Sequence, residues 1–279
     1  MPVTDATTPR GAEDPPLGLA VHREGPVAVV TLSRPHRRNA IDDATLLELE
    51  RFFAAPPPGV RAVVLTGAGG HFSAGLDLAE LTTTDVVAGI AHSRMWHRAM
   101  AAVEFGTVPV VSVLRGAVIG GGLELACATH VRVAESTAFY ALPEGQRGIF
   151  VGGGGSVRLP RLIGTARMVD LMLTGRVYDA AEAHAAGLTQ YLVADGEGLP
   201  TALALAERIA TAAPLTTFAV LQALPRIAAA DPGTGLLLEA LMSAVAQGSE
   251  EAKDRMRAFL DGRAARVSPH PDGSSGAAT

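Results

Sequence analysis

The chain alternates between short apolar runs with a two-residue period and longer segments with a helical period. Residues 17–33, LGLAVHREGPVAVVTLS, alternate around Gly25-Pro26 and predict a β-hairpin. Residues 40–55 carry apolar positions at helical spacing, and Asp42 or Asp43 would cap that helix. Residues 60–67, VRAVVLTG, predict a buried strand.

The same alternation continues along the chain. A helix is predicted over 83–105, a buried strand over 108–116, and a second helix that opens at the glycines 120–122. The helix over 83–105 is apolar around much of its circumference, which fits burial against its own core or against a partner subunit. Beyond Leu142 the pattern becomes mostly helical, so the sequence predicts an α/β fold with a helical C-terminal part.

Composition divides the chain into four segments. Residues 1–16 and 265–279 are rich in Pro, Gly, Ser, Thr and Asp, which predicts disordered tails. Between them we expect an α/β core over 17–200 and a helical region over 201–264.

Length and charge exclude several classes of protein. A chain of 279 residues that is 48% hydrophobic and 18% charged can bury a large core. The net charge is −5 and the arginines are scattered among acids, so nucleic acid is not expected as a partner. No apolar run is long enough to span a bilayer, and the N-terminal segment has acids and prolines where a signal peptide is apolar. The lone Cys127 fits a buried core position in a reducing compartment, and we expect a cytoplasmic protein without membrane contact.

Two glycine-containing loops follow buried strands, at AVVLTGAGGHFSAGLDL (62–78) and VSVLRGAVIGGGLELA (111–126). Each places backbone N–H groups at a strand end, and such amides suit a developing oxyanion. The glycines at 116, 120, 121 and 122 do not fit the G-x-G-x-x-G spacing of a dinucleotide site. The run Gly152–Gly155 lacks the Lys-Ser/Thr of a P-loop, and we interpret it as a flexible loop before a helix.

Other catalytic classes are weakly supported. Ser73 stands in HFSAG, which lacks the first glycine of a nucleophile elbow. His92 and His97 are five residues apart without an H-E-x-x-H pattern, so we interpret them as ordinary histidines and expect no metal site.

Two acids stand in apolar surroundings, Glu124 in IGGGLELACA and Glu144 in AFYALPEGQRG. Charged residues are seldom buried without a reason. If both face one cavity, desolvation and mutual repulsion leave one protonated and one ionised near neutral pH. The alternative from the residues alone is that each is a salt-bridged or half-exposed side chain.

Taken together, these motifs resemble the crotonase (enoyl-CoA hydratase/isomerase) superfamily over about Leu19 to Arg263. RPHRRNAID, FSAGLDL, GAVIGGGLELA, ALPEGQRGIFVGGGGSVRLPRLIG and LTGRVYDAAEAHAAGLTQYLV are similar to five family blocks, in the family's order. The resemblance implies a crotonase-like spiral of ββα units with a helical C-terminal oligomerisation region, and trimers or hexamers.

The resemblance also implies a chemistry. The backbone N–H groups of Leu76 and Gly121 would hold a thioester oxygen, and Glu124 and Glu144 would be the catalytic pair of an enoyl-CoA hydratase. Such an enzyme adds water reversibly across the C2=C3 bond of a trans-2-enoyl-CoA. A dienoyl-CoA isomerase would carry an acid where Gly152 stands. Δ3-Δ2 enoyl-CoA isomerisation, hydrolysis, and acyl-CoA binding without turnover stay open as alternatives.

For substrate binding, the resemblance places the CoA near one group of residues: Arg37, Ala40, Ala74, Leu76, Asp77, Leu78, Ala79 and Gly121. Arg37 and Arg38 suit phosphate contacts, or else form a basic surface turn. Phe259 and Arg263 match family positions that come near CoA. No cofactor beyond the CoA of the substrate is implied.

Overall fold

The structure, a computed structural model, describes residues 18–81 and 85–263. The predicted tails at 1–16 and 265–279 lie outside the described residues. Within the described ranges the larger sheet has the order β1-β2-β3-β4-β6-β9 and a smaller one has the order β5-β7-β8. The strands are β1 (Leu19–Glu24), β2 (Val27–Leu32), β3 (Ala62–Gly67), β4 (Val110–Leu114), β5 (Ala117–Ile119), β6 (Val131–Glu135), β7 (Phe139–Ala141), β8 (Tyr178–Asp179) and β9 (Tyr191–Val193).

The larger sheet combines one hairpin with a parallel series. β1 and β2 pair antiparallel, which confirms the predicted hairpin, and β2, β3, β4, β6 and β9 are parallel neighbours. The segments between the strands contain the helices and short 3-10 turns η1 (Pro35–Arg37), α1 (Asp43–Ala54), η2 (Leu78–Leu81), α2 (Val86–Glu104), α3 (Gly121–Ala128), η3 (Gly145–Arg147), α4 (Gly155–Ile163), α5 (Thr165–Thr174) and α6 (Ala180–Ala185). α7 (Gly198–Ala210) follows the last strand. Parallel strands need such crossovers, and the arrangement is the α/β fold that the sequence predicts.

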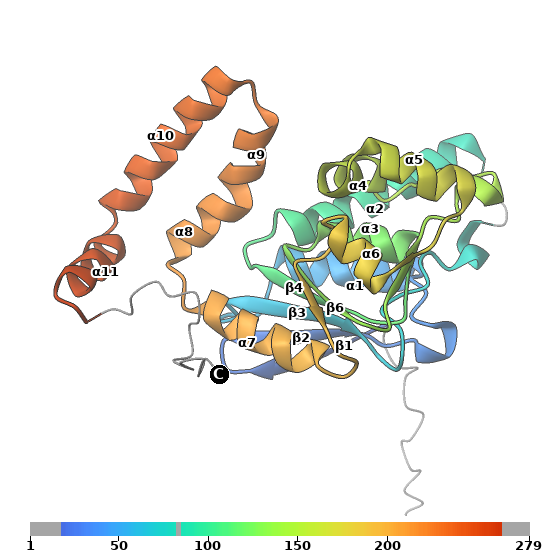
Figure 1. The fold of residues 1–279 in the computed structure, drawn as a ribbon, viewed down its shortest axis with the longest axis horizontal. Helices are drawn as coiled ribbons and strands as arrows, with labels where there is room; N and C mark the ends of the chain where they lie inside the picture. Colours follow the sequence, from blue (N-terminus) through green and yellow to red (C-terminus); the bar gives the residue numbers. More distant parts are fainter. Residues whose placement is uncertain (1–17, 82–84, 264–279) are drawn as a thin grey trace, which may run out of the picture. The chain divides into compact units, whose positions relative to one another are not determined.

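Helices cover both faces of the sheet (Figure 1). Val63 and Leu65 of β3 belong to a large core shared with α1, α2 and α3. Val64, the residue between them, belongs to a second core shared with α7. Because successive side chains of a strand point to opposite faces, a strand that is buried on both sides is apolar without interruption. β3 and β4 are buried along their full lengths.

Aspartates cap the first two long helices, and Asp42 is one of the two residues predicted from the sequence to cap the first. Asp42 accepts a hydrogen bond from the N–H of Thr45 at 2.9 Å and caps α1. Asp85 accepts one from the N–H of Ala88 at 2.8 Å and caps α2. These bonds satisfy amides that have no partner inside the helix.

The chain divides into two compact units after Thr211, later than the predicted boundary at residue 200. The physical reason is α7, which buries Ala202, Ala206 and Ala210 against the sheet and so belongs to the first unit. The second unit consists of α8 (Pro214–Phe218), a π-helical turn η4 (Ala219–Ala223), α9 (Leu224–Ala229), α10 (Pro232–Gly248) and α11 (Glu250–Leu260).

No single helix in the described ranges has both the length and the apolar character needed to cross a bilayer. One bent pair, Gly198–Ala210 with Pro214–Ala229, passes that test by length and composition only.

The two-faced core predicts where truncation destabilises the fold. Leu65 is fully buried, so Leu65→Ala should lower the free energy of unfolding by about 2–5 kcal/mol. Leu173 of α5 is 77% exposed, so Leu173→Ala serves as the matched control. It should change the free energy of unfolding by less than about 0.5 kcal/mol. Urea unfolding followed by circular dichroism measures both, and equal shifts of the two midpoints would contradict this account of the core.

Candidate active site

Two loops approach each other closely where β3 and β4 end. A Cβ placed on Gly75 would lie 2.6 Å from the carbonyl oxygen of Ile119 and 3.1 Å from the nitrogen of Gly121. A Cβ on Gly121 would lie 3.2 Å from the nitrogen of Leu76. No protein acceptor is recorded for the N–H of Leu76 or Gly121 in the part of the chain that the structure describes. Two unused amides therefore lie side by side, and that of Gly121 is at the positive end of α3.

A buried asparagine holds the first loop in place. Asn39 has φ 55° and donates from its side chain to the carbonyl oxygens of Ala68 at 2.9 Å and His71 at 2.8 Å. The backbone carbonyl oxygen of Asn39 accepts a hydrogen bond from Ser73 Oγ at 2.8 Å, and that hydroxyl accepts one from the N–H of Gly75 at 3.1 Å. The loop that carries the Leu76 amide is thus fixed from the RPHRRNAID segment.

The two loops are also joined to each other. Ser73 pairs with Val118 in an isolated parallel bridge. His71 accepts a hydrogen bond at Nδ1 from the N–H of Ala117 at 3.0 Å. The spacing of the two free amides is therefore set by hydrogen bonds rather than by a ligand.

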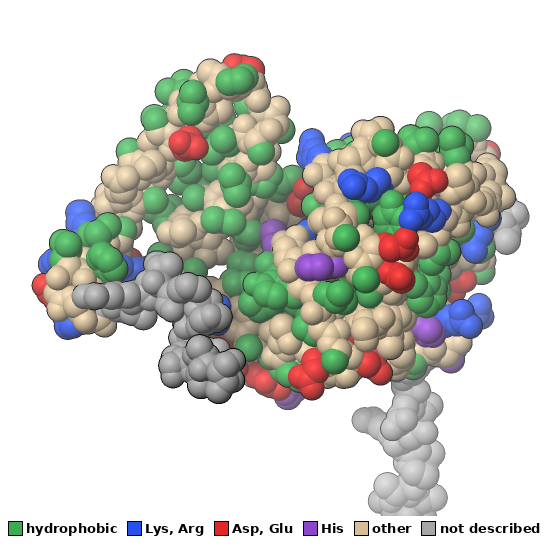
Figure 2. Space-filling model, viewed as in Figure 1, with side chains coloured by type: hydrophobic (Ala, Val, Ile, Leu, Met, Phe, Trp, Pro, Cys, Tyr) green, Lys and Arg blue, Asp and Glu red, His purple; other side chains and the backbone are tan. Residues whose placement is uncertain are grey.

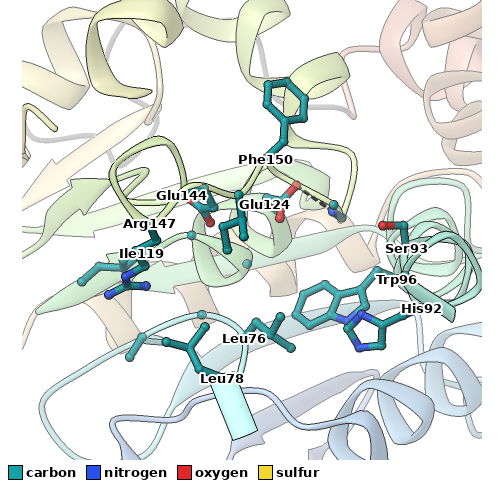
Figure 3. A pocket seen from close by; sticks show the side chains of 18 residues that line it. Leu76, Leu78, His92, Ser93, Trp96, Ile119, Glu124, Glu144, Arg147 and Phe150 are labelled. Carbon is teal, nitrogen blue, oxygen red and sulfur yellow. Dashed lines mark hydrogen bonds between the residues drawn. The ribbon is translucent and has the colours of Figure 1, made fainter. Parts of the chain in front are cut away.

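Beside the amides lies a cavity of about 210 Å³. Glu124 of α3 and Glu144, which precedes η3, both contribute to its wall, and Figure 3 shows the two carboxylates next to each other. The structure thus meets the condition, left open by the sequence, that both acids face one cavity. The other lining residues are Ala74, Gly75, Leu76, Leu78, Gly89, His92, Ser93, Trp96, Ile119, Gly120, Gly121, Arg147, Ile149, Phe150, Gly152 and Gly153.

Glu124 is buried and firmly hydrogen-bonded. Its Oε1 accepts from the N–H of Gly153 at 2.8 Å and from the N–H of Gly155 at 2.7 Å. Burial raises the pKa of Glu124, while these amides and the positive charge of Arg158 act in the opposite direction. Donors aimed at one oxygen favour the carboxylate, so Glu124 is built to carry negative charge and accept a proton.

Glu144 has a different environment. It is 9% exposed, and its Oε2 is buried without a hydrogen-bond partner among the described residues. Burial, together with the smaller effect of the nearby charge of Glu124, raises the pKa of Glu144 to about 7, against the opposite effects of its own backbone N–H and of Arg147. A carboxyl group in this position holds a proton near neutral pH. The pair can therefore supply a base and an acid in one cavity.

A glycine is required beside Glu144. Gly120 has φ 52°, a left-handed conformation that favours glycine, and a Cβ there would lie 2.5 Å from Glu144 Oε1. The GGG run of the second loop thus leaves room for a carboxylate, as well as for the close approach of the two amides.

The predicted CoA-binding residues separate into two groups. Ala74, Leu76, Leu78 and Gly121 line the cavity, whereas Arg37, Ala40, Asp77 and Ala79 do not. Asp77 is 12% exposed at its side chain and forms an ion pair with Arg34 at 3.0 Å, which fixes the loop. Arg37 lies in the exposed turn η1. Phe259 is 53% exposed in α11.

Sequence reasoning missed the wall formed by α2. Gly89, His92, Ser93 and Trp96 all line the cavity, and His92 is not an ordinary histidine of surface or core: its Nε2 lies 2.9 Å from Asp43 Oδ1. These residues recur at the spacing of three to four residues that places side chains on one face of a helix, and this period is the sequence signal that could have predicted the wall. Gly152, the position compared with a dienoyl-CoA isomerase, also lines the cavity.

The run Gly152–Gly155 leads into α4, as predicted, but it also bonds directly to Glu124. Gly153 and Gly155 are buried, and a Cβ on either would lie within 3.2 Å of Glu124 side-chain atoms. The glycines are there because a carboxylate packs against the backbone. Among the described residues, no group of three or more His, Cys, Asp or Glu side chains is arranged to hold a metal ion.

Comparison with known proteins agrees with this geometry. Residues 22–267 match the family model described as enoyl-CoA hydratase/isomerase. A short-chain-enoyl-CoA hydratase from Clostridium acetobutylicum is 33% identical over 248 residues, which cover 88% of this chain and 95% of the relative. The 2,3-dehydroadipyl-CoA hydratase of Escherichia coli is 33% identical over 249 residues, with 88% and 96% covered.

Solved structures agree as well. A candidate enoyl-CoA hydratase from Rhodopseudomonas palustris CGA009 is 58% identical, has a TM-score of 0.86, and matches 90% of this chain and 97% of its own. A candidate enoyl-CoA hydratase from Thermobifida fusca YX, solved in complex with acetoacetyl-CoA, is 30% identical with a TM-score of 0.75 and coverage of 82% and 94%. The chain belongs to the enoyl-CoA hydratase/isomerase family.

Proposed function

We propose that this protein is an enoyl-CoA hydratase, a hydro-lyase that adds water across the C2=C3 bond of a trans-2-enoyl-CoA. The observation that carries the proposal is the pairing of Glu124 and Glu144 in one cavity, in opposite hydrogen-bonding environments. Chemistry that needs a single acid would have no use for the second buried carboxyl, whose burial costs free energy. The hydratase names of the relatives support the same reaction.

In this mechanism the thioester oxygen accepts hydrogen bonds from the N–H groups of Leu76 and Gly121. Glu124 removes a proton from water as the oxygen bonds to C3, and electron density moves to the thioester oxygen as an enolate. Glu144 then delivers its proton to C2. Fixed donors that point at the developing charge lower the barrier, and losing one costs on the order of 10²–10³ in rate.

Binding follows from the same cavity. Ala74, Leu76 and Leu78 line it on the side of the oxyanion loop, where the thioester end of the CoA would lie. Trp96 and Phe150 line it as well, and Figure 3 shows Phe150 beyond the two glutamates from Leu78 and Trp96 to one side, beside His92. No cofactor beyond the CoA of the substrate is needed, because the two carboxyl groups supply both proton transfers.

The C-terminal helices support a further part of the proposal, a homo-oligomer, either trimer or hexamer. α10 buries only Gly235 within the chain. Leu236, Leu237, Leu241 and Val245 are each more than half exposed, and Figure 2 shows apolar side chains gathered over this unit. An apolar surface of this kind is typical of a protein interface.

Substituting either acid should stop hydration. Glu124→Gln and Glu144→Gln keep the shape of the side chain but remove its ability to exchange a proton, so kcat should fall by about 10²–10⁴-fold. The loss of enoyl-thioester absorbance with crotonyl-CoA measures turnover, and a thermal shift with CoA checks that binding persists. Full activity in either variant would refute the two-carboxylate mechanism. Wild-type binding without hydration would instead indicate an isomerase, a hydrolase or a binder.

Hydration should require that Glu144 is protonated while Glu124 is ionised. Because the pKa of Glu144 is raised to about 7, kcat/KM for hydration should decline above about pH 7 as Glu144 ionises. It should also decline at low pH, where Glu124 becomes protonated. A pH profile of crotonyl-CoA hydration tests this, and a rate that stays constant from pH 6 to 9 would contradict the role of Glu144 as the acid.

The same carboxyl group should oppose folding at alkaline pH. Its pKa is raised from 4.5 to about 7 in the folded protein, so the folded state loses stability relative to the unfolded state as pH rises through that interval. Glu144→Gln should therefore lose activity and yet unfold at a higher urea concentration than wild type at pH 8. At pH 4 the two proteins should unfold at nearly the same concentration.

The apolar face of α10 gives a test of assembly. Leu237→Glu combined with Leu241→Glu should convert the oligomer to a monomer, because burying two carboxylates in an interface is unfavourable. Light scattering after size-exclusion chromatography measures the mass, and Val21→Glu on the exposed strand β1 serves as the control. A wild-type monomer would overturn this part of the proposal alone.

A further inference from the structure

The loop that holds Glu124 is itself held from its other side. The peptide between Gly153 and Gly154 lies between the two amides that donate to Glu124. The Gly153 carbonyl oxygen of that peptide accepts a hydrogen bond from Arg158 Nη1 at 3.0 Å. Arg158 is in the first turns of α4, so one helix supplies both Gly155, a donor to Glu124, and the group that fixes the loop before it.

Arg158 has a fixed position of its own. Its Nε donates a hydrogen bond at 2.6 Å to Oε2 of Glu104, the last residue of α2. The side chain of Arg158 is 11% exposed and that of Glu104 is 20% exposed. The Nη1 atom of Arg158, which bonds the loop, also needs space. Gly154 has φ 97°, and a Cβ there would lie 2.3 Å from Arg158 Nη1. The glycine run therefore fits a carboxylate on one side and a guanidinium on the other.

We propose that Arg158, oriented by Glu104, is a positioning residue for Glu124: by fixing the Gly153–Gly154 peptide it aims the N–H groups of Gly153 and Gly155 at the carboxylate. The inference rests on the proposed function only in taking Glu124 as the base. Arg158 touches the loop and not the cavity, since it is absent from the lining residues.

A buried ion pair is a weak source of stability by itself, because desolvation offsets much of the attraction. Its geometry is nevertheless strict, and a guanidinium can bond two partners in one plane. Glu104 and the Gly153 carbonyl oxygen use two different nitrogens of Arg158. The pair thus transfers the rigidity of α2, a 19-residue helix, to a loop of glycines that has little conformational preference.

Several charged or titratable groups surround this contact. Glu124 faces it from α3, Glu104 and His97 from α2, and Cys127 from α3, while Glu144 faces Glu124 across the cavity. The charge of Arg158 favours the ionised form of Glu124. Removing that charge should raise the pKa of Glu124, whereas loss of packing alone would leave the balance of charges unchanged.

The test compares Arg158→Met, Arg158→Lys and Glu104→Gln in the full-length protein. We expect Arg158→Met to lower kcat by about 10–10²-fold with KM within about threefold of wild type, since a misplaced catalytic group costs rate more than binding. The low-pH limb of kcat/KM should move to higher pH. Arg158→Lys should recover part of both effects, and Glu104→Gln should lower kcat less than Arg158→Met.

A second readout needs no turnover. An infrared titration follows the protonated carboxyl band of Glu124, identified by its loss in Glu124→Gln, and should show a higher midpoint in Arg158→Met. This separates the inference from the proposed function: failure of hydration in the wild type overturns the function, while an unshifted Glu124 midpoint overturns the positioning role. If Arg158→Met does not fold, Arg158→Gln, which also removes the positive charge, gives the same measurement.

The control is a second arginine–glutamate pair on α2. Arg98 Nε lies 3.4 Å from Glu50 Oε1, and the arginine side chain is 58% exposed. Arg98→Met should leave kcat, the low-pH limb and the Glu124 midpoint unchanged. Equal effects of Arg98→Met and Arg158→Met, or a fall in stability with kcat and midpoint unchanged, would overturn the proposal.

Discussion

The close approach of two backbone segments is the constraint on which the site depends. The amides of Leu76 and Gly121 can point at one oxygen only if Gly75 and Gly121 carry no side chains, because a Cβ on either would lie within 3.2 Å of the other loop. The Leu76 loop follows β3 of the larger sheet, whereas Gly121 follows β5 of the smaller sheet. The two segments are joined by the isolated parallel bridge between Ser73 and Val118, which keeps the two amides close together. The hydrogen bonds of Asn39 and His71 then hold the loops at that separation without any ligand.

Around this pair of amides the protein buries charge that does not help it to fold. Burial raises the pKa of both Glu124 and Glu144, so at neutral pH an ionised carboxylate is held in an environment that disfavours it. The protein offsets this cost for Glu124 with two amides and leaves Glu144 Oε2 without a partner among the described residues. The unequal treatment of two identical side chains is what separates a base from an acid.

Features that depend on neighbours in sequence could be predicted, and features that depend on distant neighbours could not. The hairpin at Gly25-Pro26, the cap of α1 and the burial of Glu124 all follow from a local pattern. The α2 wall was not predicted because His92 bonds Asp43, which is 49 residues away in the sequence. His92 also faces a cavity whose other side is formed by residues 144–153. The division of the chain after Thr211 has a similar cause, because the small buried face of α7, with Ala202 and Ala206, has no local sign of the sheet that it covers.

The run Gly152–Gly155 shows why composition alone misleads. Four glycines in a row have the sequence of a flexible linker, since glycine loses more conformational entropy on folding than any other residue. Here the entropy cost of ordering the loop is offset by the two hydrogen bonds that its N–H groups donate to Glu124 of α3. It is offset further by the bond from Arg158 of α4, which is itself paired with Glu104 of α2. A side chain at 153, 154 or 155 would displace one of these partners. Glycine in this loop is therefore a condition for the site, because only a bare backbone lets Glu124 of α3 and Arg158 of α4 both bond to the same short loop.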